Sequence, residues 1–288
     1  MSYPSPVASN GKEPLTVACT PASGSAFAVG ASIVLCTVTD AIQRSAACAF
    51  SVTVAPPIPR LSFTRFVAFG DSITEGNLTF GRMLLIPSPS FSYPFRLQLR
   101  LTERYATQTF DVLDEGIGGE RIEKGVSRLP GVLITDNPEV LLLMEGVNNL
   151  NTDGASAIPA IVEGLRSMIR TTRNRRIPVL IATLLPQREG GSRAFAPTLI
   201  QPANKEIRDM ARGEGAVLVD LYQAFVGREA TLLGADGLHP NEAGYDQIAA
   251  TFFDAIRLQF EASPTPSTTA GSFGRIGAVV PFTASSSR

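Results

Sequence analysis

Length, composition and charge exclude several classes of protein. The chain has 288 residues, of which 44% are hydrophobic and 18% are charged, a balance typical of a globular protein with a buried core. The net charge of −1, with no basic cluster, argues against a nucleic acid or an anionic membrane as the main partner. No apolar run reaches the roughly 18 residues that a membrane-spanning helix needs, so we expect no transmembrane segment.

The N-terminal part of the chain has the composition of a small β module. Residues 1–55 contain short β-branched runs separated by Gly, Ser and Ala, and the prolines of residues 56–60 predict a linker. All three cysteines, Cys19, Cys36 and Cys48, lie here. Such clustering indicates an oxidising compartment, so we expect an extracellular or periplasmic protein, although the polar N-terminus lacks the apolar core of a signal peptide.

From residue 61 the pattern changes to apolar runs that alternate with amphipathic stretches. The apolar runs predict buried strands at 65–70, 109–116, 139–146, 177–185 and 215–221. The amphipathic stretches predict helices at 93–105, 157–174, 199–215 and 241–260. This alternation indicates an α/β domain over residues 61–261, with a parallel sheet covered by helices on both faces. Residues 262–288 are rich in Ser, Thr and Pro and predict a low-complexity tail.

The segment "FVAFGDSITEG" (66–76) places Ser72 where the first of these strands ends. Ser72 could cap a helix that begins there, or it could be a nucleophile at a strand-to-helix corner. The segments 116–119 and 145–148 follow the second and third strands in the same way. Because the carboxyl ends of parallel strands share one edge of the sheet, we expect these three segments to meet in one crevice.

The segment "ADGLHPNEAGY" supplies the partners that a nucleophilic serine needs. It contains His239, the only histidine of the chain, and Asp236 three residues before it. A histidine can take the proton of a serine hydroxyl, and a carboxylate on its far nitrogen fixes the tautomer. The backbone N–H groups of Ser72 and Gly119 and the side-chain amide of Asn148 would then hold the oxyanion. One histidine and a large domain without cysteine argue against a catalytic zinc, and we expect no cofactor.

Residues 63–260 therefore resemble the SGNH (GDSL-type) hydrolase family of esterases and lipases. Four family blocks occur in order: "GDSIT" with Ser72, "GIGGERI" with Gly119, "GVNN" with Asn148, and "DGLHPN" with Asp236 and His239. The resemblance implies a flavodoxin-like α/β/α sandwich, a Ser72–His239–Asp236 triad, and an oxyanion hole of Ser72, Gly119 and Asn148. Two positions depart from the family pattern, because Asn149 replaces an aspartate and Asp114 replaces an asparagine. These departures concern the hydrogen bonds that steer Asn148.

Residues 1–55 are similar to a hyalin-repeat (HYR) module, an immunoglobulin-like β-sandwich of extracellular proteins, with the first strand absent. This resemblance implies a carbohydrate or surface partner for the module. It also implies a cross-strand disulfide between Cys36 and Cys48, which flank a hairpin about Ile42, so that Cys19 lacks a partner.

The function predicted from these residues is serine carboxylic-ester hydrolysis of short-chain acyl or aryl esters, that is, of a small-molecule substrate. Alternatives are a carbohydrate acetylesterase that acts on acetylated glycans, a lysophospholipase, and an adhesion or carbohydrate-binding protein whose hydrolase domain is inert. Two loops, 77–95 and 186–197, are expected to shape the pocket, the second with Arg188 and Arg193. We interpret Asp71 as a brace of the Ser72 turn and Asp220 as structural.

Overall fold

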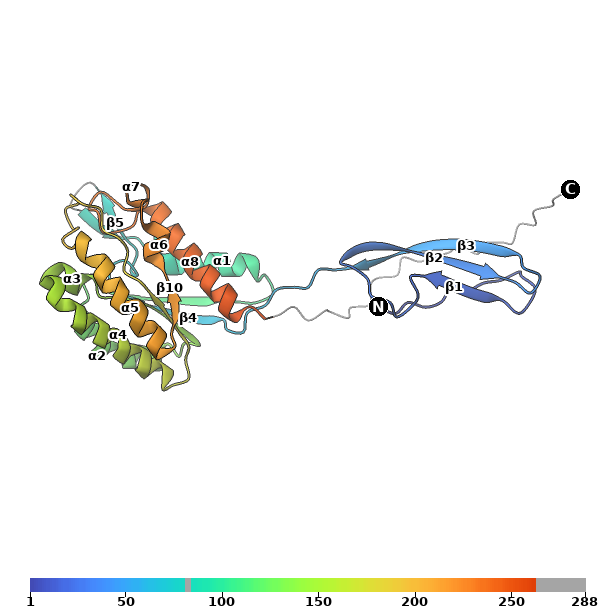
Figure 1. Cartoon of the computed structure of the whole chain (residues 1–288), viewed down its shortest axis with the longest axis horizontal. Coiled ribbons are helices and arrows are strands. Elements are labelled where there is room, and N and C mark those ends of the chain that lie inside the picture. The colour runs from blue at the N-terminus through green and yellow to red at the C-terminus, as the bar shows by residue number, and fades with distance from the viewer. Residues whose placement is uncertain (81–83, 263–288) are drawn as a thin grey trace. The chain divides into compact units, whose positions relative to one another are not determined.

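The protein consists of two compact units (Figure 1). The structure is a computed structural model, and it describes residues 1–80 and 84–262. The first unit contains Met1–Ile58 and the second begins at Pro59. The predicted tail, from residue 263 on, lies outside the described residues. Among the helices that the structure describes, none is long and apolar enough to cross a membrane.

The N-terminal unit contains one antiparallel sheet of three strands. The strands β1 (Thr16–Thr20), β2 (Gly30–Thr39) and β3 (Ser45–Val54) pair in the order β1-β2-β3. One face of the sheet is covered, because Val34 and Val52 are buried in a small cluster with Tyr3. Within residues 1–58 no second sheet faces this one, so the expected immunoglobulin-like sandwich finds no support here.

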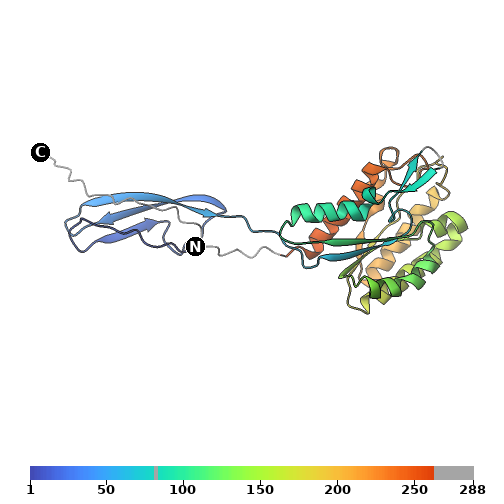
Figure 2. The ribbon, with the colours of Figure 1, turned by 180° about the vertical axis from the view of Figure 1, so that it is seen from behind.

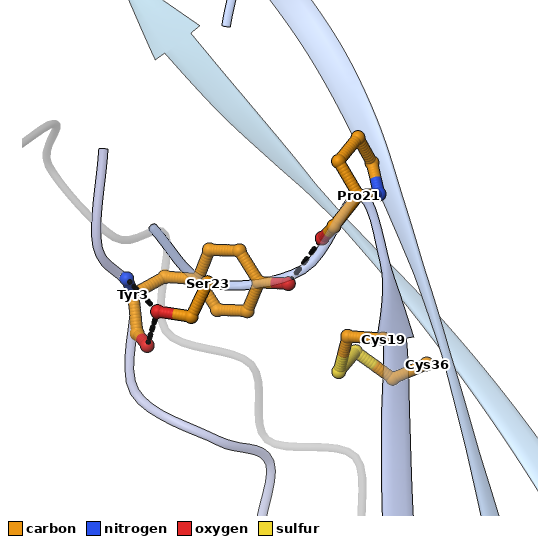
Figure 3. Close-up of a disulfide and its surroundings, with 5 residues drawn as sticks. All are labelled: Tyr3, Cys19, Pro21, Ser23 and Cys36. Atoms are coloured by element: carbon orange, nitrogen blue, oxygen red, sulfur yellow. Dashed lines mark hydrogen bonds between the residues drawn. A yellow bond between two sulfur atoms is a disulfide. The ribbon is translucent and has the colours of Figure 1, made fainter. Parts of the chain in front are cut away.

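The disulfide of this unit differs from the prediction. Cys19 pairs with Cys36, as Figure 3 shows. Cys48 carries a free thiol. The predicted Cys36–Cys48 bond is therefore wrong. Its physical reason lies in the register: β2 is the central strand, so Cys36 lies opposite Cys19 on β1 and opposite Cys48 on β3. The resemblance implied the hairpin partner Cys48, but both Cys19 and Cys48 lie opposite Cys36.

The second unit is built on a parallel sheet that contains all five predicted strands. They are β4 (Arg65–Gly70), β7 (Asp111–Gly116), β8 (Val140–Met144), β9 (Val179–Ala182) and β10 (Val217–Val219). β4, β8 and β9 are almost entirely buried, as expected for strands covered on both faces. The order β10-β9-β8-β4-β7 is the doubly wound order in which the first strand lies between the second and the third.

Helices cover both faces of this sheet, as Figures 1 and 2 show. On one face α1 (Tyr93–Arg104) packs against α8 (Glu242–Phe260). On the other face α2 (Ile122–Thr135), α4 (Ile158–Arg173) and α5 (Ile200–Glu214) pack side by side. The α/β architecture is therefore as predicted, although helix α2 was not.

Helix α2 escaped prediction because its sequence contains helix-breaking residues. Pro130 lies inside the helix, next to Gly131. Both residues disfavour a helix interior by propensity. The helix forms because Leu129, Val132 and Leu133 are buried against the rest of the domain, and this packing outweighs the local preference.

Short elements complete the unit on the side where the strands end. The expected apolar loop after Ser72 contains a hairpin of β5 (Asn77–Phe80) and β6 (Leu84–Pro87). The remaining short helices are α3 (Val147–Asp153), α6 (Leu221–Phe225) and α7 (Glu229–Leu232), together with three 3₁₀ turns at Pro89–Phe91, Gly154–Ala157 and Pro197–Leu199. The connections that leave β4 and β8 run to opposite sides of the sheet. In this strand order, ligands bind at that switch point, at the carboxyl ends of the two strands.

Candidate active site

Ser72 lies directly after β4, in a tight turn. Gly70 ends the strand so close to β8 that a Cβ there would lie 2.2 Å from the Met144 carbonyl oxygen. The Asp71 carboxylate accepts a hydrogen bond from the Ile73 N–H at 3.0 Å and braces the turn, as expected. The helix expected at Ser72 is absent, because β4 leads through hydrogen-bonded turns into β5. Ser72 is therefore held by the turn rather than by a helix N-terminus.

The hydroxyl of Ser72 contacts the only histidine of the chain. Ser72 Oγ lies 2.8 Å from His239 Nε2, although the two residues are 167 positions apart. On the other side of the ring, His239 Nδ1 lies 2.6 Å from Asp236 Oδ2. All three side chains are buried. The prediction that the imidazole comes within hydrogen-bonding reach of Ser72 is confirmed.

A single turn holds Asp236 and His239 in place. Asp236 Oδ1 accepts hydrogen bonds from the N–H groups of Leu238 and His239, both at 3.0 Å. Gly237 between them has φ +77°, a conformation that favours glycine. Burial raises the pKa of the Asp236 carboxyl, but the hydrogen bonds from His239 and from the Leu238 N–H outweigh it, and the pKa falls to about 2. The carboxylate is therefore ionised and accepts the Nδ1 proton, which leaves Nε2 able to accept the proton of Ser72.

Two further predicted residues lie beside this triad. Gly119 has φ +74°, and its backbone is exposed. Asn148 lies at the start of α3, and its side-chain amide donates to the Glu120 carbonyl at 2.8 Å. The same nitrogen makes only a long contact of 3.5 Å with the Asp71 carboxylate. One amide proton of Asn148 thus orients the side chain, and the second is available to another acceptor.

Asn149, which replaces the aspartate of the family pattern, still anchors α3. Asn149 is buried, and its Oδ1 accepts the N–H of Ile122 at 2.9 Å. Its Nδ2 donates to Glu123 at 2.9 Å. Asn149 therefore ties α3 to the first turn of α2, and its side chain bonds to Ile122 and Glu123 rather than to the Asn148 side chain. Asp114, the second departure, accepts a hydrogen bond from the Gly116 N–H at the end of β7.

These groups open into a pocket of about 270 Å³. Its lining joins residues from the ends of several strands: Ser72, Leu85, Gly118, Gly119, Asn148, Asn151, Thr152, Arg193, Phe195, Leu238 and His239. Both loops expected to shape it contribute, through Leu85 of the hairpin and Arg193 of the segment after β9. Arg188 does not line it, because its N–H and guanidinium donate to the carbonyls of Gly237 and Gly234. Arg188 therefore stabilises the turn that carries Asp236 and His239 and does not face the pocket.

A carboxyl that the sequence did not single out lies behind the site. Glu145, at the end of β8, is 1% exposed, and neither of its carboxyl oxygens has a hydrogen-bond partner among the described residues. Burial, with the nearby charges of Asp71 and Glu120, raises the pKa of Glu145 to about 8. Burial likewise raises the pKa of Asp71 to about 6. Asp220, by contrast, pairs with Arg208 at 2.9 Å and caps α6, which agrees with the structural interpretation.

Known proteins share the fold of the second unit and part of its sequence. Esterase TesA of Pseudomonas aeruginosa is 26% identical over 162 residues, which cover 54% of this chain and 76% of that protein. The structure resembles a lipase/acylhydrolase from Enterococcus faecalis, with a TM-score of 0.58 and 23% identity over 70% of this chain and 98% of that one. It also resembles a family 3 carbohydrate esterase from Clostridium thermocellum, with a TM-score of 0.54 and 25% identity over 68% of this chain and 98% of that one.

The profile of the GDSL-like lipase/acylhydrolase family matches residues 68–247, a range that contains every predicted site residue. The match spans more than half of the chain. Together with the fold and the Ser72–His239 hydrogen bond, it means that this chain belongs to the GDSL-like lipase/acylhydrolase family and is a carboxylic ester hydrolase.

Proposed function

We propose that Ser72, His239 and Asp236 are the catalytic triad of this ester hydrolase, acting on short-chain acyl or aryl esters. The observation that carries the proposal is the chain of two hydrogen bonds from Ser72 Oγ through the imidazole to Asp236. A serine hydroxyl becomes a nucleophile when an adjacent base takes its proton. The ionised Asp236 orients that base and stabilises the imidazolium that forms.

The reaction follows from these contacts in two steps. Ser72 Oγ attacks the ester carbonyl carbon while His239 Nε2 takes the hydroxyl proton. The C–O bond to the alcohol then breaks, and the alcohol leaves with that proton. Water, deprotonated by His239, attacks the acyl-enzyme in the same way, releases the acid and restores Ser72.

We assign the oxyanion hole to the backbone N–H groups of Ser72 and Gly119 and to the Asn148 amide. All three residues line the pocket next to His239. The long contact of Asn148 with Asp71 supports the role, since the proton involved is weakly engaged in the absence of a substrate oxygen. Each such donor contributes about 3 to 4 kcal/mol to a transition state that develops charge on oxygen.

The small pocket supports short acyl groups as substrates. A volume of about 270 Å³ lies just below the range of about 300–1,000 Å³ that is usual for ligand sites. Acetylated carbohydrates are a second candidate substrate, favoured by this volume and by the likeness to the family 3 carbohydrate esterase. Comparing p-nitrophenyl esters of increasing chain length with acetylated xylan distinguishes the two.

An extracellular or periplasmic location belongs to the same proposal. It is supported by the Cys19–Cys36 disulfide, because structural disulfides persist mainly in oxidising compartments. We also propose a carbohydrate or surface partner for the N-terminal sheet, and pull-down on insoluble glycans tests it. Fractionation of cells of the source organism that finds the protein only in the cytosol would contradict the location.

The triad is tested by Ser72→Ala. We expect hydrolysis of p-nitrophenyl acetate to fall by at least about 10³-fold, with an unchanged far-UV circular dichroism spectrum. Ser127→Ala is the matched control, because Ser127 is exposed on α2 and its hydroxyl donates to the Lys124 carbonyl of the same helix. A Ser72→Ala protein that retains activity would exclude Ser72 as the nucleophile.

A further inference from the structure

Among the described residues that line the pocket, one carries a fixed charge. Of the eleven lining residues, Leu85, Phe195 and Leu238 are apolar, and Arg193 contributes a guanidinium. An arginine is always protonated at the pH values at which proteins fold. The pocket therefore presents a positive charge to whatever binds beside Ser72.

The backbone of Arg193 is fixed from two sides. Its N–H donates to the carbonyl of Asp236 at 2.9 Å, and its own carbonyl accepts from Asn151 Nδ2 at 3.2 Å. Asn151 in turn accepts from Gln187 Nε2 at 2.7 Å. The loop after β9 is thus attached both to the catalytic turn and to α3. Arg193 lies at a defined place relative to the triad rather than on a loose loop.

The guanidinium itself is only partly engaged. Its Nε lies 3.8 Å from Asp236 Oδ2, an oxygen that already takes the shorter bond of 2.6 Å from His239. The two terminal amino groups of Arg193 have no hydrogen-bond partner within the described part of the chain, and the side chain is 42% exposed. Arg128, for comparison, directs its guanidinium to Glu115 and Glu120. Arg193 thus keeps most of its donors available at the pocket.

We propose that Arg193 is a specificity residue that binds a carboxylate carried by the ester substrate. A guanidinium fork matches the two oxygens of a carboxylate and holds it by two parallel hydrogen bonds. The apolar side chains of Leu85, Phe195 and Leu238 then accommodate the hydrocarbon between the carboxylate and the ester. The inference rests on the proposed function, since it places the carboxylate relative to Ser72.

The experiment compares charged esters with neutral esters of the same shape. Mono-p-nitrophenyl adipate carries the carboxylate on the acyl side, on a chain too long for fast internal attack on the ester, and the p-nitrophenyl ester of adipic acid monoamide is its neutral counterpart. Para-acetoxybenzoate carries it on the alcohol side, and para-acetoxybenzamide is its counterpart. Arg193→Gln removes the charge, and Arg193→Lys keeps the charge without the fork. Arg175→Gln, at an exposed position in the turn after α4, is the control.

For at least one charged ester, we expect Arg193→Gln to lower kcat/KM about tenfold or more while its neutral counterpart changes less than about twofold. Arg193→Lys should give an intermediate loss, and added salt should reduce the preference of the native protein. The pair that responds identifies the side on which the carboxylate binds.

Equal losses on charged and neutral esters would overturn the inference, because Arg193 would then act through Asp236. If Arg193→Gln kept the native ratio of kcat/KM between charged and neutral ester in both pairs, the inference would be overturned as well. Failure of the proposed function is seen separately, as activity on the neutral esters that survives Ser72→Ala.

Discussion

Substituting Glu145 with Gln tests how the buried carboxyl behind the active site affects stability. The Glu145 side chain packs so closely against α2 that a Cβ on Gly125 would lie 2.2 Å from Oε2. No described group donates a hydrogen bond to it. Burying an ionised carboxylate without partners is unfavourable, so the folded protein keeps Glu145 protonated. Glutamine has the same shape and no charge.

The magnitude follows from the pKa. It is 4.5 for an unperturbed glutamate and about 8 for Glu145 in the folded protein. Between these pH values the folded state holds a proton that the unfolded state releases. The free energy of unfolding therefore falls as pH rises, by about 1.4 kcal/mol per pH unit and at most about 5 kcal/mol in total. Glu145→Gln removes this dependence. The free energy of unfolding of the variant therefore rises relative to that of the native protein as pH increases from 5 to 8.

The assay is urea unfolding at several pH values between 5 and 8, followed by circular dichroism at 222 nm. This signal reports the second unit, which contains all the helices of the described residues. Glu103→Gln, an exposed position on α1, is the control and should follow the native protein at every pH. Asp71 titrates in both proteins, so the difference between them reports Glu145. A constant difference between Glu145→Gln and the native protein across this range would refute the reasoning.

Three further substitutions or labelling experiments test the site and the N-terminal unit. Asp236→Asn should lower kcat on p-nitrophenyl acetate by about 10³- to 10⁴-fold, because an amide no longer secures the imidazole tautomer; a loss below tenfold would contradict the role of Asp236. Gly119→Ala should destabilise the fold by about 1–2 kcal/mol, since φ is +74°, and should also lower kcat by moving the N–H; an unchanged melting temperature and kcat would argue against both effects. Alkylation without reductant, followed by peptide mapping, should label Cys48 and recover Cys19 linked to Cys36, whereas a peptide joining Cys36 to Cys48 would show the other pairing.

Local patterns in the sequence were sufficient for the sheet and for most of its helices. Five segments of strand length became the five parallel strands. The signal was strongest for β4, β8 and β9, because buried strands need continuous apolar residues. Helix α2 was missed, since Pro130 and Gly131 oppose a helix locally and only burial stabilises it. The disulfide was assigned wrongly because the strand order, which the spacing of cysteines does not contain, makes Cys36 a neighbour of both others.

The amino-acid sequence by itself determined the chemistry available to the site. Asp236 and His239 share one turn, and Ser72 lies in the turn that follows one strand, so short motifs reveal these residues. Only the tertiary structure decided the environment. It brings Ser72 to His239 across 167 positions, places Arg193 at the pocket and buries Glu145 without a partner. The physical reason is that distances, desolvation and charge–charge interactions depend on which segments pack together, and long-range packing leaves no local signature in the chain.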